Sequence, residues 1–134
     1  MPTTATGTRE RAGVTDTIVL TVPAEEPYRG VATLVLGGIG SRLDLPFERM
    51  DDMQLALLSL LDAADGHELS MEVEVRVEEV SVSVGPLAEG SGSDEALRRV
   101  LSPLVDAVEP HRREGAEWVT LRLARSRAGS PDPA

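Results

Sequence analysis

Residues 69–84 read LSMEVEVRVEEVSVSV, and this stretch carries the strongest structural pattern in the chain. Apolar side chains alternate with polar ones from Leu69 to Val77 and again from Val80 to Val84. A period of two residues places the apolar side chains on one face of a strand and the polar ones on the other. The stretch therefore predicts an antiparallel hairpin with one buried face and one wet face.

Two helices are expected before this hairpin. The first begins near Pro27, and apolar residues then recur every three or four positions as far as Leu43, which is typical of an amphipathic helix. The second runs from about Pro46 to Asp65 and contains LALLSLL at 55–61. Because this segment is apolar on almost every side, it needs several neighbours, and we expect it to be the central helix under the sheet.

A third helix is expected after the hairpin. Ser93 or Asp94 would cap its start, and it would end near Glu109 and Pro110. Its apolar stripe consists of Leu97, Val100, Leu101, Leu104, Val105 and Val108. Pro103 interrupts this stripe, so we expect the proline to kink the helix or to confine its regular part to either side.

Alternating residues also predict a first strand at 17–22 and a last strand at 117–125. The expected order is therefore strand, helix, helix, strand, strand, helix, strand. It predicts the α+β class, as a two-layer α/β sandwich with a mixed, mostly antiparallel sheet and helices on one face. We assign residues 17–125 to this one domain, and residues 1–16 and 126–134, which lack apolar periodicity, to flexible tails.

The net charge, the absence of Cys and the lack of long apolar runs exclude several classes of function. The formal net charge is -10, whereas nucleic-acid binding requires clustered cations that neutralise phosphates, so we expect no nucleic-acid partner. The absence of Cys excludes disulfides, thiolate zinc sites and cysteine nucleophiles. The sequence has no run of eighteen apolar residues and no secretory leader, which predicts a cytoplasmic protein without a membrane partner.

All thirteen positive side chains are Arg, and the chain contains neither Lys nor Asn. The codons for Lys and Asn are AT-rich, so a bacterial source with GC-rich DNA is the simplest explanation. The missing Asn also has a chemical consequence, because no Asn amide is available anywhere in the chain to hold a metal ion.

Three stretches stand out together with the expected order of elements. They are VPAEEPYRGVATLVLGGIGSRLDLPFERMDDMQLAL at 22–57, DMQLALLSLLDAADGH at 52–67, and LVDAVE at 104–109 with EGAEWVTLRLAR at 114–125. Over about Thr17 to Arg125 the chain thereby resembles the anti-sigma-factor serine kinases, which are small GHKL-type ATPases related to histidine kinases that govern bacterial sigma factors by partner switching. This resemblance implies the histidine-kinase-like ATPase fold, whose usual cofactors are ATP and magnesium.

The positions that match the family's chemistry hold other residues here. Where the family has a general-base Glu and, four residues later, a magnesium-binding Asn, this chain has Ser59 and Ala63. A hydroxyl without a base cannot take a proton at neutral pH, and a methyl group offers a cation no oxygen. The family's adenine-binding Asp and the first glycine of that motif fall on Pro86 and Ala88. The resemblance therefore implies a degenerate pocket that has lost ATP and metal and contains no catalytic residue.

We accordingly expect a non-catalytic regulatory binding module that acts in bacterial transcription control through protein–protein interaction. Its partner would be a sigma factor or an anti-sigma antagonist, and a homodimer is a further option. The alternative is an ATP-binding anti-sigma factor with serine kinase activity in a remodelled pocket, where Asp62, Glu68 or Glu89 would replace the lost ligands. A third interpretation is a structural or dimerisation partner for an intact paralogue.

The two histidines, two glycines and the tryptophan are interpreted mainly as structural residues. His67 and His111 lack neighbours that would complete a metal site, and we expect both in loops. Gly90 and Gly92 precede the third helix and are interpreted as linker residues rather than phosphate ligands. Trp118 is expected to fill an edge of the core, with an anchor for a protein partner as the other option.

Two further expectations concern polar residues within regular elements. The cluster Glu72, Glu74, Glu78 and Glu79 is interpreted as a solvated strand face, with a docking surface as the other option. Ser59, on an apolar helix, is expected to bond a backbone carbonyl of its own helix.

Overall fold

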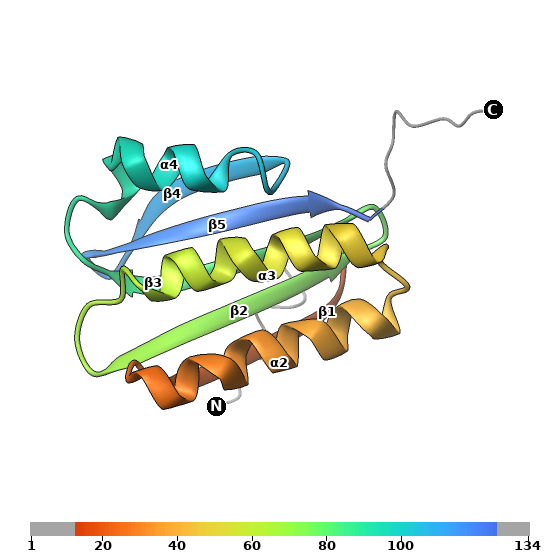
Figure 1. Cartoon of the computed structure of the whole chain (residues 1–134), viewed down its shortest axis with the longest axis horizontal. Helices are drawn as coiled ribbons and strands as arrows, with labels where there is room; N and C mark the ends of the chain where they lie inside the picture. The colour runs from red at the N-terminus through yellow and green to blue at the C-terminus, as the bar shows by residue number, and fades with distance from the viewer. Residues whose placement is uncertain (1–12, 126–134) are drawn as a thin grey trace.

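The computed structural model describes residues 13–125 (Figure 1). Within this range it contains five β-strands, three α-helices and one short 3-10 helix. In chain order these are β1 (Val14–Pro23), α2 (Glu26–Arg42), α3 (Phe47–Leu61), β2 (Glu68–Arg76), β3 (Glu79–Leu87), η1 (Ser91–Ser93), α4 (Glu95–Leu101), β4 (Ala107–Arg113) and β5 (Ala116–Ala124). The expected order therefore lacks one strand, β4.

The strands form one sheet in the order β1-β2-β3-β5-β4, and every neighbouring pair of these strands is antiparallel. Two hairpins, β2–β3 and β4–β5, lie next to each other, and β1 extends the first of them. Helices α2 and α3 cover one face of the sheet as a second layer (Figure 1). The α+β class and the two layers are thus confirmed, whereas the expected mixture of parallel and antiparallel pairs is wrong.

The hairpin expected from the alternating pattern is confirmed. Val73 lies opposite Val82 and Met71 opposite Val84, and all four side chains are buried. Their face lies beneath α3, which contacts both β3 and β5. The rest of the buried core consists of Ala32, Leu36, Met50, Met53, Ala56, Leu57, Leu60, Leu61, Leu69, Val75, Val80, Leu87, Leu101, Val105, Val119, Leu121 and Leu123. The expected central position of the second helix is therefore confirmed, but Leu55 and Leu58 are 47% and 41% exposed, so the expectation that this segment is covered on almost every side is wrong.

Helices α2 and α3 pack against each other and share this core. Pro27 stands in the first turn of α2, and Pro46 precedes the first residue of α3, where a missing N–H removes no helical hydrogen bond. Gly40 of α2 approaches α3 so closely that a β-carbon there would overlap Met50 Sδ. A glycine at this position therefore permits the close approach of the two helices.

The third helix is shorter than expected, and its extension to about residue 109 is wrong. Its start is as predicted, because the Asp94 carboxylate accepts from the backbone N–H groups of Ala96 and Leu97. Helix α4 ends at Leu101, just before Pro103, which has no N–H for the next helical bond. The residues beyond the proline turn and enter β4 instead.

The second hairpin, β4–β5, is not expected from the sequence interpretation. The segment HRREG at 111–115 is strand up to Arg113, and only Glu114 and Gly115 form the turn. Both turn residues have positive φ, 52° and 81°, which is the geometry of a two-residue turn whose twist matches that of the strands. Val108 of the predicted helical stripe lies opposite Leu121 in this hairpin.

The domain begins earlier than expected, since Val14, Thr15 and Asp16 belong to β1. The assignment of residues 1–16 to a tail is wrong for these three. Gly13 is a turn residue just before the strand, and residues 1–12 and 126–134 lie outside the described range. Thr15 Oγ1 donates to the Val75 carbonyl at 3.0 Å, which ties the start of β1 to β2. None of the helices in residues 13–125 combines the length and apolar character needed to cross a membrane.

Candidate interaction surface

The four positions expected to line a degenerate pocket lie near the ends of α3 and β3. Ser59 is inside α3, and its hydroxyl donates to the Leu55 carbonyl at 3.2 Å, so the expected bond within its own helix is confirmed. Ala63 follows the helix, and its carbonyl accepts from the Ala88 N–H at 2.8 Å. Pro86 lies two residues before Ala88 at the end of β3. The structure thus brings Ala63 directly against the β3 end, while the Ser59 hydroxyl is used within α3.

A short antiparallel bridge joins these two ends. Asp65 N–H donates to the Pro86 carbonyl at 3.1 Å, and Ala64 lies opposite Leu87. The backbone groups that make these contacts are therefore used by the chain itself. The side chains of Ala63, Pro86 and Ala88 contain no hydrogen-bonding atom, so these three side chains offer a ligand neither a donor nor an acceptor.

The three carboxylates considered as replacement ligands do not converge. Asp62, at the end of α3, forms an ion pair with Arg29 of α2. Glu89 forms an ion pair with Arg112 of β4, and Glu68 is exposed at the start of β2. Helix α2 contacts β1, whereas β4 is the opposite edge of the sheet, so the first two carboxylates are drawn apart. Within residues 13–125, no group of three or more His, Asp or Glu side chains is placed to hold a metal ion.

Gly90 and Gly92 belong to a tightly bonded loop, so their interpretation as plain linker residues is wrong. Their N–H groups donate to the two carboxylate oxygens of Glu117 at 2.8 and 2.7 Å. These bonds, first that from Gly92 and then that from Gly90, hold the pKa of Glu117 below its usual range. A β-carbon on Gly92 would lie 2.8 Å from Pro110 Cβ. The loop therefore binds an anion that the chain itself supplies.

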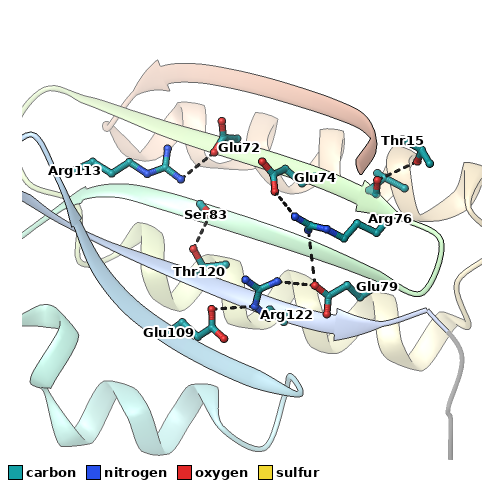
Figure 2. Close-up of polar contacts among 11 residues, drawn as sticks. Thr15, Glu72, Glu74, Arg76, Glu79, Ser83, Glu109, Arg113, Thr120 and Arg122 are labelled. Atoms are coloured by element: carbon teal, nitrogen blue, oxygen red, sulfur yellow. Dashed lines mark hydrogen bonds and ion pairs between the residues drawn. The ribbon is translucent and has the colours of Figure 1, made fainter. Parts of the chain in front are cut away.

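The sheet face away from α2 and α3 carries a connected group of polar side chains, which we term the polar face. It comprises Ser70, Glu72, Glu74 and Arg76 of β2, Glu79, Ser81 and Ser83 of β3, Glu109, His111 and Arg113 of β4, and Trp118, Thr120 and Arg122 of β5. In Figure 2 the helices lie behind the sheet and this face is toward the viewer. Ser81, Ser83 and Thr120 are nevertheless only 4%, 7% and 8% exposed. Long side chains of the same face must therefore cover them.

A row of ion pairs crosses four strands of the polar face (Figure 2). Arg122 donates from Nε to Glu109 at 2.9 Å and from Nη1 to Glu79 at 2.6 Å. Arg76 donates to Glu74 at 3.2 Å and lies 3.8 Å from Glu79. The bond with Glu109 is the main cause that raises the pKa of Arg122. The interpretation of this acidic cluster as a solvated face is therefore wrong for Glu72, Glu74 and Glu79, each of which is paired with an arginine.

A second group on the polar face centres on the only tryptophan of the chain. The Trp118 ring lies on Gly85, where a β-carbon would overlap it. The Arg113 guanidinium lies 4.2 Å from the ring centre, which is cation–π geometry, and donates to Glu72 at 2.9 Å. Trp118 is thus half-buried on the polar face instead of at an edge of the apolar core.

His111 connects the tryptophan to the buried hydroxyls. It lies in β4, so its expected place in a loop is wrong, whereas His67 does lie in the turn before β2. His111 Nε2 is 2.9 Å from Thr120 Oγ1, which is 2.7 Å from Ser83 Oγ. Burial and then the nearby Arg113 lower the pKa of His111, which favours the neutral ring. This chain of bonds provides partners for hydroxyl groups that are shielded from water.

The arginines of the polar face were not identified as functional residues from the sequence. One signal was present, because Arg76 has the same parity as Glu74 in β2 and therefore shares its face. The contact between Arg122 and Glu79 had no such signal, since it requires β5 to lie beside β3. Cross-strand pairs of this kind depend on the order of strands in the sheet.

No protein-family model matches this chain, and no curated protein is similar to it in sequence. The chemistry of the described surface is therefore the guide to function. The polar face presents arginines and a half-buried tryptophan, which are residue types enriched at protein–protein interfaces. It is a candidate surface for binding another protein.

Proposed function

We propose that this chain is a non-catalytic regulatory binding module of the anti-sigma-factor kinase type, with the histidine-kinase-like ATPase fold. It acts in bacterial transcription control by binding a sigma factor or an anti-sigma antagonist. The two-layer arrangement, with α2 and α3 on one face of a five-stranded sheet, supports the fold assignment together with the sequence resemblance.

The observation that carries this proposal is the backbone bond of 2.8 Å between Ala88 and Ala63. The resemblance implies that these positions belong to the nucleotide site of the family. In this chain their polar backbone groups bond to each other, and the Ser59 hydroxyl bonds to its own helix. The nearest alternative ligands, Asp62 and Glu89, are paired with arginines. These contacts favour direct packing of the α3 end against the β3 end over a site for ATP and magnesium.

The polar face supplies the chemistry for a protein partner. Arg113 and Trp118 lie in contact on it, and these two residue types recur among the side chains that contribute most to binding energy at protein interfaces. The net charge of -10 steers the chain toward a partner with a basic surface. The proposed function therefore rests on the contact between Arg113 and Trp118 on the polar face and on the backbone bond between Ala88 and Ala63.

Calorimetric titration with ATP and magnesium tests the loss of nucleotide binding. We expect no saturable heat, because no described group at the family positions can hold either the metal or the adenine. Saturable binding, or transfer of phosphate to a protein substrate, would overturn the proposal and favour the ATP-binding kinase.

Titration of the purified chain with each sigma factor and antagonist encoded in the same genome tests the binding role. We expect one of them to form a stoichiometric complex, and Arg113→Ala to weaken it about tenfold while the circular dichroism spectrum is unchanged. Arg99→Ala is the control, because Arg99 is an exposed residue of α4 away from the polar face. The absence of any complex, or an equal effect of both variants, would count against the proposal.

A further inference from the structure

The carboxyl end of α4 borders two surface cavities, at the place where the chain turns from α4 into β4 (Figure 1). The larger has a volume of about 330 Å³ and is lined by Glu95, Arg98, Arg99 and Ser102. The smaller has a volume of about 210 Å³ and is lined by Arg98, Ser102, Val105, Asp106, Ala107 and Val108. Because Arg98 and Ser102 line both, the two cavities form one depression, which we term the α4 pocket.

Both carboxylates of the α4 pocket have arginine partners. Asp106 accepts from Arg49 at 2.7 Å and from the Ala124 N–H at 2.6 Å, and the Arg49 side chain is only 15% exposed. Glu95 lies 3.8 Å from Arg99, one turn further along α4. The two negative charges are therefore matched within the chain.

Arg98 carries a positive charge that no acidic side chain of residues 13–125 balances. Its guanidinium forms neither a hydrogen bond nor an ion pair in this range, and it is exposed. The carbonyl end of a helix carries a partial charge of about -0.5, which is smaller than the full charge of one guanidinium. The α4 pocket is therefore locally positive, although the net charge of the chain is -10.

Ser102 adds a hydroxyl group to the pocket, one helical turn after Arg98. Its backbone N–H donates to the Arg98 carbonyl at 2.9 Å, which keeps Ser102 in helical register. Residues four apart in a helix lie on the same side of it. The Ser102 hydroxyl has no hydrogen-bond partner in the part of the chain that the structure describes, whereas the Ser59 hydroxyl of α3 bonds to its own helix. The Ser102 hydroxyl is therefore available to a ligand.

We propose that the α4 pocket binds the phosphoryl group of a small phosphomonoester. Arg98, Arg99 and Ser102 can all donate hydrogen bonds, and guanidinium groups pair bidentately with phosphate oxygens. A phosphoryl group has three strong acceptor oxygens, enough for all three side chains, whereas a carboxylate has two. A guanidinium has five N–H donors, so Arg99 can bind the ligand and remain beside Glu95.

The smaller cavity indicates the chemistry of the rest of the ligand. Its apolar wall consists of Val105, Ala107 and Val108. None of the residues that line the α4 pocket is aromatic, so it has no surface on which a nucleotide base would stack. A short aliphatic group therefore matches this wall better than a nucleoside does.

NMR titration of the isotope-labelled chain with butyl phosphate tests the site. At about pH 8, above the second pKa of a phosphoryl group at about 6, we expect saturable shifts of the amide signals within residues 95–108. Sodium chloride at equal ionic strength is the control and should not shift them. Shifts that do not saturate, or that spread equally over α2, would overturn the proposal.

Two arginine variants separate a specific site from a general attraction to a helix end. Arg98→Gln should weaken the binding of butyl phosphate about tenfold, because it removes a charged donor. Arg42→Gln is the matched control. Arg42 also lies in the last turn of a helix and has no side-chain partner within residues 13–125, but it belongs to α2, which α3 separates from α4 (Figure 1).

Both arginines are exposed, so we expect the circular dichroism spectra of the two variants to be unchanged. Equal affinities of Arg98→Gln and Arg42→Gln for butyl phosphate would overturn the proposal.

Inorganic phosphate distinguishes a free anion from an ester as the ligand. Butyl phosphate should bind at least about fourfold more tightly than inorganic phosphate, which is the effect of removing one methylene group from water. Equal affinities would overturn the assignment of an ester. These measurements need no protein partner, and neither Arg98 nor Ser102 belongs to the polar face, so their failure is distinct from a failure of the proposed function.

Discussion

The two faces of the sheet reach similar burial by different means. Beneath α2 and α3, Val73, Val82 and Leu121 are buried by apolar packing. On the polar face, Ser83 and Thr120 are almost as inaccessible, but arginines, glutamates and a tryptophan surround them. The first face depends on shape and on removal of apolar surface from water, and the second on hydrogen bonds and charges. Substitutions on the two faces should therefore differ in size and in their response to pH and salt.

The apolar face should show the largest loss of stability. Leu121→Ala removes a fully buried side chain and leaves a cavity, so the free energy of unfolding should fall by about 2 to 5 kcal/mol. Urea denaturation followed by circular dichroism measures it. The loss should be nearly independent of salt concentration, and a strong dependence on salt would contradict the apolar account of this face.

A glycine on the polar face should show the next largest effect. Gly85→Ala places a methyl group against the Trp118 ring, and overpacking of this kind costs about 1 to 3 kcal/mol. The same substitution in a Trp118→Ala background is the matched control, where the methyl group meets no ring. Equal losses in both backgrounds, measured by urea denaturation as a double-mutant cycle, would show that the ring is not the cause.

The ionisation of Glu117 should make the stability of the folded chain depend on pH. Its pKa is depressed in the folded chain, so its carboxylate contributes stability above the unfolded-state pKa, and this contribution is lost as the pH falls through the folded-state pKa. Glu117→Gln should lower Tm at neutral pH, and the difference from the unmodified chain should narrow on acidification. Calorimetry over a series of pH values measures this difference.

The matched control for Glu117 is Glu95→Gln. Glu95 lies 3.8 Å from Arg99 on the exposed surface of α4 and accepts none of the loop bonds that hold Glu117. We expect a smaller change in Tm from this substitution. A Glu117→Gln difference that stayed constant from neutral to acid pH would mean that the bonds from Gly90 and Gly92 do not depend on the carboxylate charge.

The row of ion pairs should show the smallest effect. Arg122→Gln removes the cation between Glu79 and Glu109, and because the site is partly open to solvent we expect a loss of about 1 kcal/mol. The loss should decrease at high salt, because ions screen exposed charges. Arg99→Gln, on the exposed surface of α4, should have almost no effect. Equal losses for the two variants, from denaturation at low and high salt, would show that the row does not act as a connected group.

Local patterns in the sequence predicted the β2–β3 hairpin, the central helix α3 and the cap at Asp94. Each depends on residues a few positions apart, whose relation is set by the period of a strand or a helix. The same reasoning extended α4 too far, because Val105 and Val108 fit a helical stripe as well as they fit a turn and a strand. Pro103 marked the break, but only pairing with β5 shows that a strand follows.

The candidate site was less predictable than the fold. The resemblance directed attention to Ser59, Ala63, Pro86 and Ala88. The structure places Ala63 against the end of β3, where its carbonyl accepts from the Ala88 N–H. The polar face was visible only as an acidic cluster. Its arginines come from β2, β4 and β5, and no local spacing relates them to one another.

The amino-acid order alone therefore indicates which side chains avoid water, since burial of a strand or helix face follows from its own period of apolar residues. The tertiary fold is needed to show which polar groups meet. Glu117 reaches the loop at Gly90, Arg122 reaches Glu79, and Trp118 covers Gly85 only after strands distant in the chain are placed side by side. The physical reason is range: apolar periodicity is a property of neighbouring residues, whereas a hydrogen bond or an ion pair forms only between atoms within a few ångströms of each other.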